Sequence, residues 1–524
     1  LSELLVMLRR FAARTAASAA LGVAAGKTFA VCDGSSARMS RTSSLGLPEF
    51  ATPAGSDWSN TSQRMLADGL ADWVGNLEYE TALRSLRQSF ALPLTVVDEL
   101  RAHFAAEARA GLAGEPSSLA MLPTFVTNRV TGNEIGDFFA LDLGGTNFRV
   151  LRLRLEGSGK LGAVTQAAYL VSDEIKTGTG EALFGFIADS VAHFLATKCD
   201  NTLDGVLGFT FSFPCHQTTL NSGELLTWNK GFSASGVIGE DVVKLLQDQL
   251  IERGIRLRIE ALCNDTVGTM EAAAYMDPRA TVGIIFGTGT NGAYIERRAA
   301  ITKGDGPPSE EMVVNTEWGN LDMRRFMNDF DRQLDAKSSN PGKQTFEKMV
   351  SGLYLGEVFR LAITSPQVLR ALSPECAAAI STSLGSRGSL PSASMAVCEG
   401  DISPQLTHVD GILRQSGIPS TFRDRVLVRD ACICVSSRAA RLAAMSIVGI
   451  VDLKNQNAQA PSVDMSTTVA VDGTVFECYP YFKERMEASI QEMIGRERAS
   501  NVNLVLAKDG SGIGAAIIAA IARQ

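Results

Sequence analysis

The chain of 524 residues is longer than one hydrophobic core usually serves, so its length predicts two domains. Hydrophobic residues make up 45% of it and charged residues 20%, which is typical of a folded globular protein rather than a disordered or fibrous one. The formal net charge of -8 disfavours nucleic acid as a partner, because binding to phosphate backbones depends on clustered Lys and Arg.

Composition argues against three more kinds of protein. Nine cysteines without a CxxC pair are typical of reduced thiols and not of a disulfide framework. The four histidines show no HExxH spacing, which argues against a zinc site. No uninterrupted apolar run reaches the roughly 20 residues that span a bilayer, so we do not expect an integral membrane protein.

The first 64 residues differ in composition from the rest. Residues 1–27 carry Arg9, Arg10, Arg14 and Lys27 against one acid, Glu3. This pattern fits an organelle-targeting helix or a helix on a membrane surface, and a disordered or loosely docked extension fits it equally well. Residues 33–64 are rich in Ser, Gly, Pro and Thr, which predicts a linker. We expect a cytoplasmic protein, with an organelle or its surface as the alternative.

Beyond the linker, apolar residues recur at helical spacing from about Trp73 to Phe104. The apolar run FFALDL at 138–143 predicts a buried strand. Residues 431–451 predict a long buried helix, and the segments 381–396 and 453–464 on either side of it are expected to be surface loops. The C-terminal LVLAKDGSGIGAAIIAAIA predicts a strand, a Gly-rich turn and a helix. The start of this helix could face phosphate or adenosine, but plain helix packing is the favoured role.

Two segments share one pattern, FFALDLGGTNFRVLRL at 138–153 and TVGIIFGTGTNGAYIE at 281–296. Each combines an apolar strand, a turn of Gly, Thr and Asn, and a second strand. The pair suggests a duplicated fold in which two related domains each present a Gly-rich turn to a shared cleft. Two unrelated hairpins with similar turn chemistry are the alternative.

The first turn has the chemistry of a phosphate site. Gly144 and Gly145 leave room for backbone N–H groups to approach an anion, and Thr146 and Asn147 add side-chain donors. Asp142 would repel a bare phosphate, so a bridging Mg²⁺ that keeps its waters is predicted beside it. Taken alone, such glycines more often mark a tight hairpin. Neither turn is a Walker A loop or a dinucleotide fingerprint.

From residue 121 onward the chain contains, in order, MLPTFV, LDLGGTNFRV, KTGTGEALF, LGFTFSFPC, WNKGF, NDTVGTM, GTGTN, NTEWG, NPGKQTFEKMVSGLYLGE and DGSG. This order and these separations resemble the hexokinase family of the actin-like ATPase superfamily. The resemblance implies an α/β fold of two actin-like ATPase (ribonuclease H-like) domains hinged around a central cleft. It places a large domain at 65–129 and 264–507 and a small domain at 130–263 and 508–524, after the N-terminal segment at 1–64.

The resemblance also implies a hexose site, with glucose as the expected substrate. The residues that it assigns to the sugar are Ser212, Asn229, Lys230, Asn264, Asp265, Asn291, Glu317 and Glu347. Asn229 departs from the family pattern, which has Thr at this position. An amide donates and accepts hydrogen bonds with a longer reach than a hydroxyl, so the preferred hexose stays open.

On the nucleotide side, the resemblance implies ATP and Mg²⁺, with the metal near Asp142 through water. The residues that it assigns to the phosphates are Gly144, Gly145, Thr146, Asn147, Gly287 and Thr288, while Gly473 and Thr474 resemble the adenosine segment. Arg149 and Lys230 could offset charge on the transferred group. Ile513 replaces a Lys that is frequent in DGSGxG, so that loop is given no phosphate role.

Asp265 is the predicted catalytic base. The segment IEALCNDTVGTMEAAAYM predicts a strand that ends at Asn264 and Asp265, followed by a helix. A helix N-terminus favours a charged carboxylate, as a proton acceptor requires, although an Asp there is usually a simple N-cap. The resemblance makes Asp265 the group that accepts the proton of the sugar 6-hydroxyl.

These assignments predict an ATP-dependent hexose kinase that forms hexose 6-phosphate, the first step of glycolysis. Association into a homo-oligomer or with an organelle surface through residues 1–27 stays open. One alternative is a catalytically weak sugar sensor or scaffold with the same fold, which the intact set of Asp142, Lys230, Asp265 and both turns disfavours. Another is a superfamily kinase for glycerol, acetate or a different sugar, against which SFPC, NDT and EWG together favour hexose.

Overall fold

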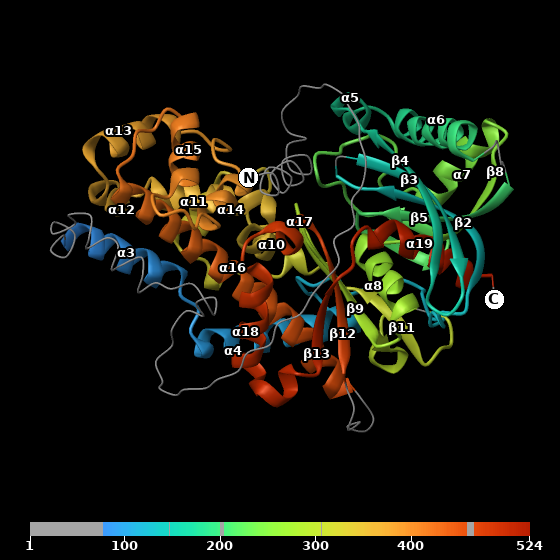
Figure 1. Ribbon diagram of the computed structural model, residues 1–524. Coiled ribbons are helices and arrows are strands. Elements are labelled where there is room, and N and C mark those ends of the chain that lie inside the picture. Colours follow the sequence, from blue (N-terminus) through green and yellow to red (C-terminus); the bar gives the residue numbers. More distant parts are fainter. Residues whose placement is uncertain (1–76, 146, 200–203, 305, 458–465, 524) are drawn as a thin grey trace.

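The computed structural model describes residues 77–145, 147–199, 204–304, 306–457 and 466–523. The predicted N-terminal segment and linker, the start of the first helical run at Trp73 and the turn residue Thr146 lie outside the described residues. Figure 1 shows two lobes, each built around a β-sheet, and the C-terminal helix α19 (Gly510–Ile521) lies with the strands of the smaller lobe. The mixed α/β, two-domain fold class is confirmed.

The smaller lobe contains a five-stranded sheet in the order β4-β3-β2-β5-β8. Strands β2, β3 and β4 are antiparallel, whereas β5 and β8 run parallel to β2. Three helices and a two-stranded hairpin complete this part of the chain. The bounds of the elements are β2 Ile135–Leu143, β3 Asn147–Glu156, β4 Leu161–Leu170, α5 Asp173–Thr177, α6 Gly180–Lys198, β5 Asp204–Phe211, β6 Cys215–Thr219, β7 Ser222–Leu225, α7 Val242–Glu252 and β8 Arg256–Cys263.

The alternation of side chains along β2 determines which way Asp142 points. Phe139, Leu141 and Leu143 are buried in the core shared with α6 and α7, whereas Phe138 and Ala140 are buried on the opposite face with α19. Asp142 has the parity of Phe138 and Ala140, so the strand directs its carboxylate toward the start of α19.

The larger lobe repeats this strand order. Its six-stranded sheet has the order β1-β11-β10-β9-β12-β13, in which β9, β10 and β11 are antiparallel and β12 and β13 run parallel to β9. The bounds are β1 Leu122–Pro123, β9 Ala280–Phe286, β10 Thr290–Arg297, β11 Glu311–Asn315, β12 Thr467–Asp472 and β13 Val502–Leu506. The pattern shared by 138–153 and 281–296 therefore corresponds to one sheet topology built twice.

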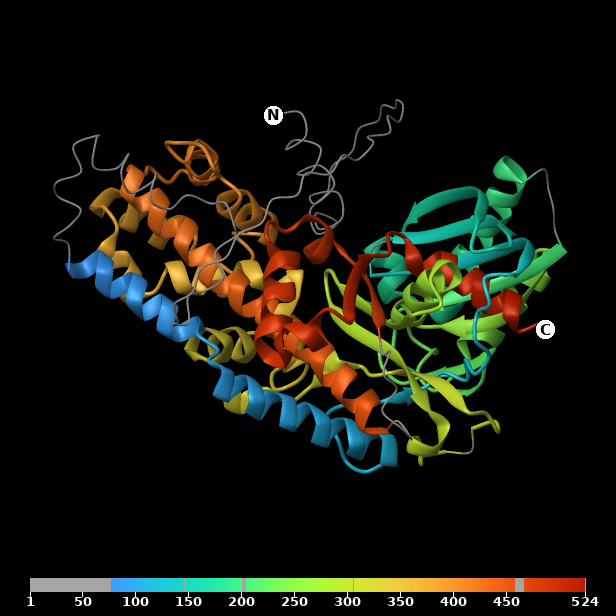
Figure 2. The ribbon, with the colours of Figure 1, turned by 60° about the horizontal axis from the view of Figure 1, so that its bottom comes forward.

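Most helices of the larger lobe pack around one long helix, α16 (Phe422–Asn457), and in both views α4 lies beside it (Figures 1 and 2). Pro93 separates the first two helices of the described chain, because its ring removes a backbone N–H and disfavours the helical conformation before it. The remaining bounds are α3 Leu77–Phe90, α4 Leu94–Ala113, α9 Asp329–Ala336, α10 Thr345–Val350, α11 Gly352–Ile363, α12 Pro366–Ala371, α13 Pro374–Ser383, α14 Ser392–Glu399, α15 Thr407–Gln415, α17 Thr474–Cys478 and α18 Phe482–Ala499, with short 3-10 turns at Arg298–Ala300, Trp318–Asn320 and Arg324–Phe326.

The predicted long buried helix at 431–451 is confirmed within α16. Among the described residues, α16 alone is long and apolar enough to cross a bilayer, and its apolar stretch is mostly buried inside the protein. The surface-loop prediction for 381–396 is wrong at both ends, since α13 runs to Ser383 and α14 begins at Ser392. Ser392 is buried and its hydroxyl donates to the Gly352 carbonyl, a tertiary contact that composition does not reveal. Residues 453–457 belong to α16, and 458–464 lie outside the described residues.

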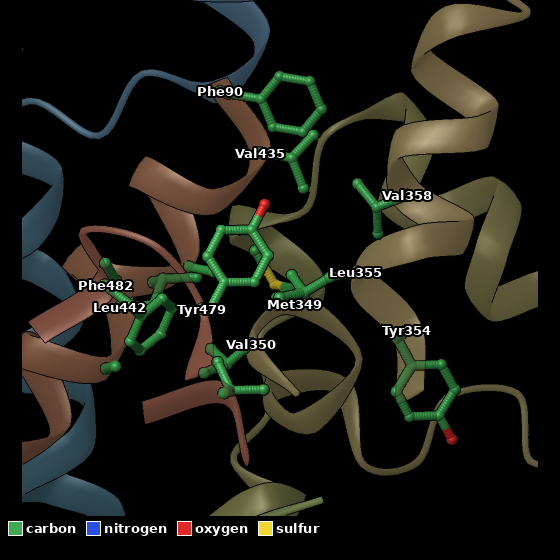
Figure 3. Packing of buried hydrophobic residues seen from close by; sticks show 14 of the residues in the cluster. Phe90, Met349, Val350, Tyr354, Leu355, Val358, Val435, Leu442, Tyr479 and Phe482 are labelled. Carbon is green, nitrogen blue, oxygen red and sulfur yellow. The ribbon is translucent and has the colours of Figure 1, made fainter. Parts of the chain in front are cut away.

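Short helices next to the site are fixed by the large core. Figure 3 shows Met349 and Val350 of α10 and Leu355 of α11 packed with Val435 of α16 and with Tyr479. Met349, Leu355 and Val435 are at most 1% exposed. A densely packed core resists displacement, so the backbone of α10 is held in place. The side chain of Glu347, which lies outside this core, therefore starts from a fixed position on α10.

Helix α8 (Asp265–Met276) crosses α19 at very close range. A Cβ at Gly514 would lie 1.8 Å from the Gly268 carbonyl oxygen, and a Cβ at Gly268 would lie 2.3 Å from that of Ser511. The glycines are therefore required for the approach of the two helices, and the predicted packing role of the C-terminal Gly-rich segment is confirmed. The domain boundaries stay a prediction; that at 263 coincides with the end of β8 and that at 508 with the turn before α19.

Candidate active site

Asp265 is the first residue of α8 and follows directly on strand β8 and Asn264. The cap of this helix is Asn264, whose Oδ1 accepts the Thr266 backbone N–H at 3.1 Å. Asp265 Oδ1 lies 3.0 Å from the same N–H, and the Asp265 side chain remains 19% exposed. The interpretation of Asp265 as a simple N-cap is therefore wrong, because the neighbouring amide fills that place.

Lys230 joins three elements of the site. Its Nζ lies 3.9 Å from Asp265 Oδ2 and donates to the Ser212 carbonyl at 2.8 Å. A Cβ at Gly145 would lie 3.3 Å from the Cβ of Lys230, so the first glycine turn rests against this lysine. Lys230 adopts φ of 52°, a left-handed conformation that is unusual for a side chain and is often found at functional sites. The stem of Lys230 thus packs against the first turn, while its ammonium reaches toward the Asp265 carboxylate.

Two half-buried carboxylates of the larger lobe, Glu317 and Glu347, feel the charge of the same lysine. Burial raises the pKa of Glu347 to about 7, and a hydrogen bond from the Thr290 backbone N–H at 3.0 Å acts in the opposite direction. Burial likewise raises the pKa of Glu317, although the Asn315 amide and the charge of Lys230 favour its ionised form. Glu317 also has φ of 53°, held by the fully buried Trp318 that follows it. Both carboxylates are acceptors with few charged partners.

Three amides connect these groups. Asn291 Nδ2 lies 2.8 Å from Asn315 Oδ1, 3.2 Å from Glu317 Oε1 and 3.3 Å from Asn264 Oδ1. Asn315 Nδ2 in turn donates to Glu317 Oε1 at 2.9 Å. The network reaches from β10 and β11 to the start of α8. It therefore links the side chain of Asn264, the neighbour of Asp265, to that of Glu317.

Asn229 and Ser212 come from the smaller lobe. Ser212 follows β5 directly and is 4% exposed. The Asn229 carbonyl accepts the Phe232 N–H at 3.0 Å, which closes the turn of WNKGF. Asn229 Oδ1 is buried and accepts no hydrogen bond from the described residues. A buried acceptor without a partner is costly, which points to a ligand that supplies the missing donor.

Asp142 lies in a compact charged cluster beside the first turn. Its Oδ2 accepts from Arg149 Nε at 3.1 Å, from Arg149 Nη2 at 2.5 Å and from Ser511 Oγ at 2.8 Å. Arg149 Nη1 also donates to Asp509 Oδ1 at 2.6 Å. The carboxylate of Asp142, and to a lesser degree that of Asp509, raises the pKa of Arg149 well above its usual range. Of the neighbouring Asn147, only the backbone at the start of β3 is described.

The second turn meets the predicted adenosine segment. Gly473 has φ of 111°, and a Cβ there would lie 2.4 Å from the Phe286 carbonyl oxygen, so only glycine allows this approach to the turn. A Cβ at Gly287 would lie 3.5 Å from Gly473 Cα, and Thr474 follows as the first residue of α17. Thr288 is exposed. The structure therefore brings Gly287, Thr288, Gly473 and Thr474 to one place.

The donor set fits a divalent cation only in one way. Among the described residues no group of three or more His, Cys, Asp or Glu side chains could enclose a metal ion. Mg²⁺ usually keeps several waters and is bound by one or two carboxylates together with substrate phosphates. Asp142, already engaged by Arg149 and Ser511, fits an outer position that reaches such an ion through water.

Sequence reasoning did not identify Asn315, Ser511 and Asp509 as members of the site. Asn315 stands two residues before Glu317 in NTEWG, so this proximity was available as a signal. Ser511 bonds to Asp142 across 369 residues of chain, and no local pattern indicates that contact.

Comparison with protein families agrees with this geometry. Two family models, both described as hexokinase, match residues 82–275 and 281–521. Hexokinase-1 of Oryza sativa subsp. japonica is 41% identical over 465 residues, which cover 85% of this chain and 91% of the relative. Hexokinase-1 of Arabidopsis thaliana is 39% identical over 455 residues, which cover 84% of this chain and 90% of the relative.

Solved structures give the same result. The hexokinase from Schistosoma mansoni complexed with glucose superposes with a TM-score of 0.75 at 37% identity, over 85% of this chain and 99% of its own. A second hexokinase crystal structure gives a TM-score of 0.73 at 32% identity, over 85% of this chain and 100% of its own. The fold, the assembled site and these matches together show that the chain belongs to the hexokinase family.

Proposed function

We propose that this protein transfers the terminal phosphoryl group of ATP to the 6-hydroxyl of glucose and related hexoses. The observation that carries the proposal is the place of Asp265, a partly exposed carboxylate at the start of α8 with Lys230 Nζ at 3.9 Å. The Schistosoma mansoni relative, which is solved with glucose, supports a hexose as the acceptor.

The sugar-side cluster is defined as Ser212, Asn229, Lys230, Asn264, Asn291, Asn315, Glu317 and Glu347. Apart from Asn315, its carboxylates and amides would accept hydrogen bonds from the ring hydroxyls of a hexose or donate to them. A site that places buried polar groups against each hydroxyl rejects analogues that lack one, because the group is then left unpaired. The Oδ1 of Asn229, which has no partner among the described residues, is such a group.

In the transfer step, Asp265 would accept the proton of the 6-hydroxyl as that oxygen bonds to the terminal phosphorus and the bond to the ADP oxygen breaks. General-base catalysis of this kind contributes about 10²- to 10⁴-fold in rate. Lys230, beside both Asp265 and Gly145, would offset negative charge on the transferred group. Closure of the two lobes on the hexose would keep water from accepting the phosphoryl group.

The nucleotide-side cluster is defined as Asp142, Arg149, Asp509 and Ser511. Backbone N–H groups of the turns with Gly144, Gly145, Thr146 and Asn147, and with Gly287 and Thr288, would hold the phosphates, and Gly473 and Thr474 would border the adenosine. When bound, Mg²⁺ neutralises phosphate charge, and Asp142 would hold it through water. Arg149 is paired with two carboxylates, so we assign it chiefly to the orientation of Asp142.

A coupled ATP-consumption assay over glucose, fructose and mannose tests the proposal. We expect hexose-dependent turnover that falls by about 10²- to 10⁴-fold in Asp265→Ala and Asp265→Asn, while calorimetry still detects hexose binding. Asp248→Ala, an exposed acid on α7, is the control and should keep wild-type turnover. Equal turnover of wild type and both Asp265 variants would remove Asp265 from its role.

The place of the protein in the cell is a separate proposal. We propose a cytoplasmic enzyme, and the basic residues 1–27 keep association with an organelle as the alternative. Hexokinase-4 of Oryza sativa subsp. japonica, whose name is qualified as chloroplastic, is 38% identical over 451 residues. Fluorescent fusions with and without residues 1–27 would decide between the two compartments.

A further inference from the structure

The side chain of Asn315 occupies the centre of the amide network without belonging to the residues predicted to touch the sugar. It ends strand β11 and is 4% exposed. Its Oδ1 accepts from Asn291 Nδ2 at 2.8 Å, and its Nδ2 donates to Glu317 Oε1 at 2.9 Å. The direct contact from Asn291 Nδ2 to Glu317 Oε1 is longer, at 3.2 Å, so Asn315 fixes both neighbours more closely than they fix each other.

The fold determines this position. In the register of β10 against β11, Ala293 is the Cα partner of Asn315, so Asn291 extends past the end of the pairing on the neighbouring strand. On the other side, the left-handed φ of Glu317 turns its carboxylate back toward Asn315. The Asn315 amide accepts from Asn291 through its oxygen and donates to Glu317 through its nitrogen at once.

We propose that Asn315 is a positioning residue that holds Glu317 as an oriented, hydrogen-bonded acceptor for the hexose and keeps Asn291 aligned with it. The inference rests on the proposed hexose kinase function. Glu317 Oε1 faces two amide donors, which leaves its other oxygen to receive hydroxyl donors. Without Asn315, Glu317 would keep only the longer of these two contacts, that from Asn291 at 3.2 Å.

The substitution Asn315→Asp gives a readout that a merely structural role would not produce. At high pH, the introduced carboxylate and that of Glu317 would both be charged at hydrogen-bonding distance and would repel each other, so Glu317 would leave its position. At low pH, a shared proton would restore an O–H donor toward Glu317. The hexose KM of this variant relative to wild type should therefore rise with pH.

The experiment measures kcat and hexose KM from pH 5.5 to 8.5 for wild type, Asn315→Asp, Asn315→Ala and Asn503→Asp. We expect the KM ratio of Asn315→Asp to wild type to grow by about tenfold or more across this range, with a much smaller change in kcat. Asn315→Ala should raise KM without this increase toward high pH. Asn503→Asp is the matched control, since it makes the same chemical change at an exposed position on β13, at the far edge of the same sheet, and its ratio should stay flat.

The double variant Asn315→Asp with Glu317→Gln provides a second check. A Gln amide at position 317 can donate to the carboxylate introduced at position 315, so the pH dependence of the KM ratio should disappear even though KM itself stays high. Equal KM changes in Asn315→Asp and Asn315→Ala at every pH would overturn the inference, as would wild-type KM values in both. Absence of hexose-dependent turnover in the wild type would instead overturn the proposed function.

Discussion

The nucleotide-side and sugar-side clusters lie next to corresponding turns of two sheets with the same strand order, yet their charges are handled in opposite ways. On the nucleotide side, Asp142 and Asp509 share one guanidinium, that of Arg149. On the sugar side, the half-buried Glu317 and Glu347 accept hydrogen bonds from an amide and a backbone N–H instead of forming an ion pair, and their pKa values are raised. The repeated topology therefore fixes where the turns stand, while the side chains around each turn decide which ligand can lie beside it.

This difference follows from the ligands that we propose. A polyanion is repelled by free carboxylates, so an acid beside the phosphates is tolerable when an arginine compensates it. A neutral polyol needs acceptors that are not already engaged by cations, so carboxylates held by neutral donors are useful there despite the cost of burying them. The sugar side should thus be less stable than the nucleotide side when no ligand is bound.

The largest expected effect comes from breaking the compensated cluster. Arg149→Ala would leave Asp142, which is 5% exposed, without its cation, and we expect a loss of roughly 3 kcal/mol in the free energy of unfolding. Adding Asp142→Asn to Arg149→Ala should recover much of this loss, because the uncompensated charge is then removed. Urea unfolding of the three proteins measures both effects.

Arg256→Ala is the control for this prediction. Arg256 pairs with Asp204 at 2.6 Å in the same sheet, but both side chains are about two-thirds exposed, at 70% and 65%. Such a surface pair contributes little to stability, because both ions remain hydrated and screened. If Arg149→Ala costs no more than Arg256→Ala, the cluster around Asp142 is not a compensated buried charge and the contrast between the two sides fails.

A second, smaller effect concerns the pH dependence of the sugar side. Burial raises the pKa of Glu347 to about 7, so the unliganded protein holds a proton there below that pH. Hydroxyl donors favour the ionised form, so hexose binding must expel the proton. The hexose KM should fall as the pH rises toward 7, by up to about tenfold per pH unit, and level off above it. Initial rates of wild type between pH 5.5 and 8.5 measure this.

The same group gives a stability prediction of known sign. Its folded pKa is above the unfolded value of 4.5, so its contribution to stability is complete below that value and is lost as the pH rises through about 7. Glu347→Gln should remove this part of the pH dependence of both KM and unfolding, whereas Glu497→Gln, an exposed acid on α18, should retain it. A wild-type KM that does not change across pH 7 would contradict the assignment.

The sequence predicted those features that depend on neighbouring residues. The Gly-rich turns between strands and Asp265 at the start of a helix follow from local patterns, and each is found in the structure. The helices at the ends of 381–396 and the Asp142 to Ser511 contact do not, because they depend on packing between segments distant in the chain. Asn315 combines local and distant information. It lies within a recognised motif, but its contact with Asn291 depends on the register between β10 and β11.

The smallest expected change in the free energy of unfolding is at Asn229, and its sign is opposite to that at Arg149. Asn229 Oδ1 is buried without a partner among the described residues, so Asn229→Ala should raise the free energy of unfolding of the unliganded protein by about 1 kcal/mol. The same change should raise the hexose KM by about fivefold, because the donor that a sugar hydroxyl supplies loses its acceptor. Asn229→Thr should fall between Asn229→Ala and wild type for KM, since its hydroxyl is shorter than the amide. Thermal unfolding and initial rates over the three hexoses check both signs, and a loss of stability with an unchanged KM would show that Asn229 supports the fold and not the sugar.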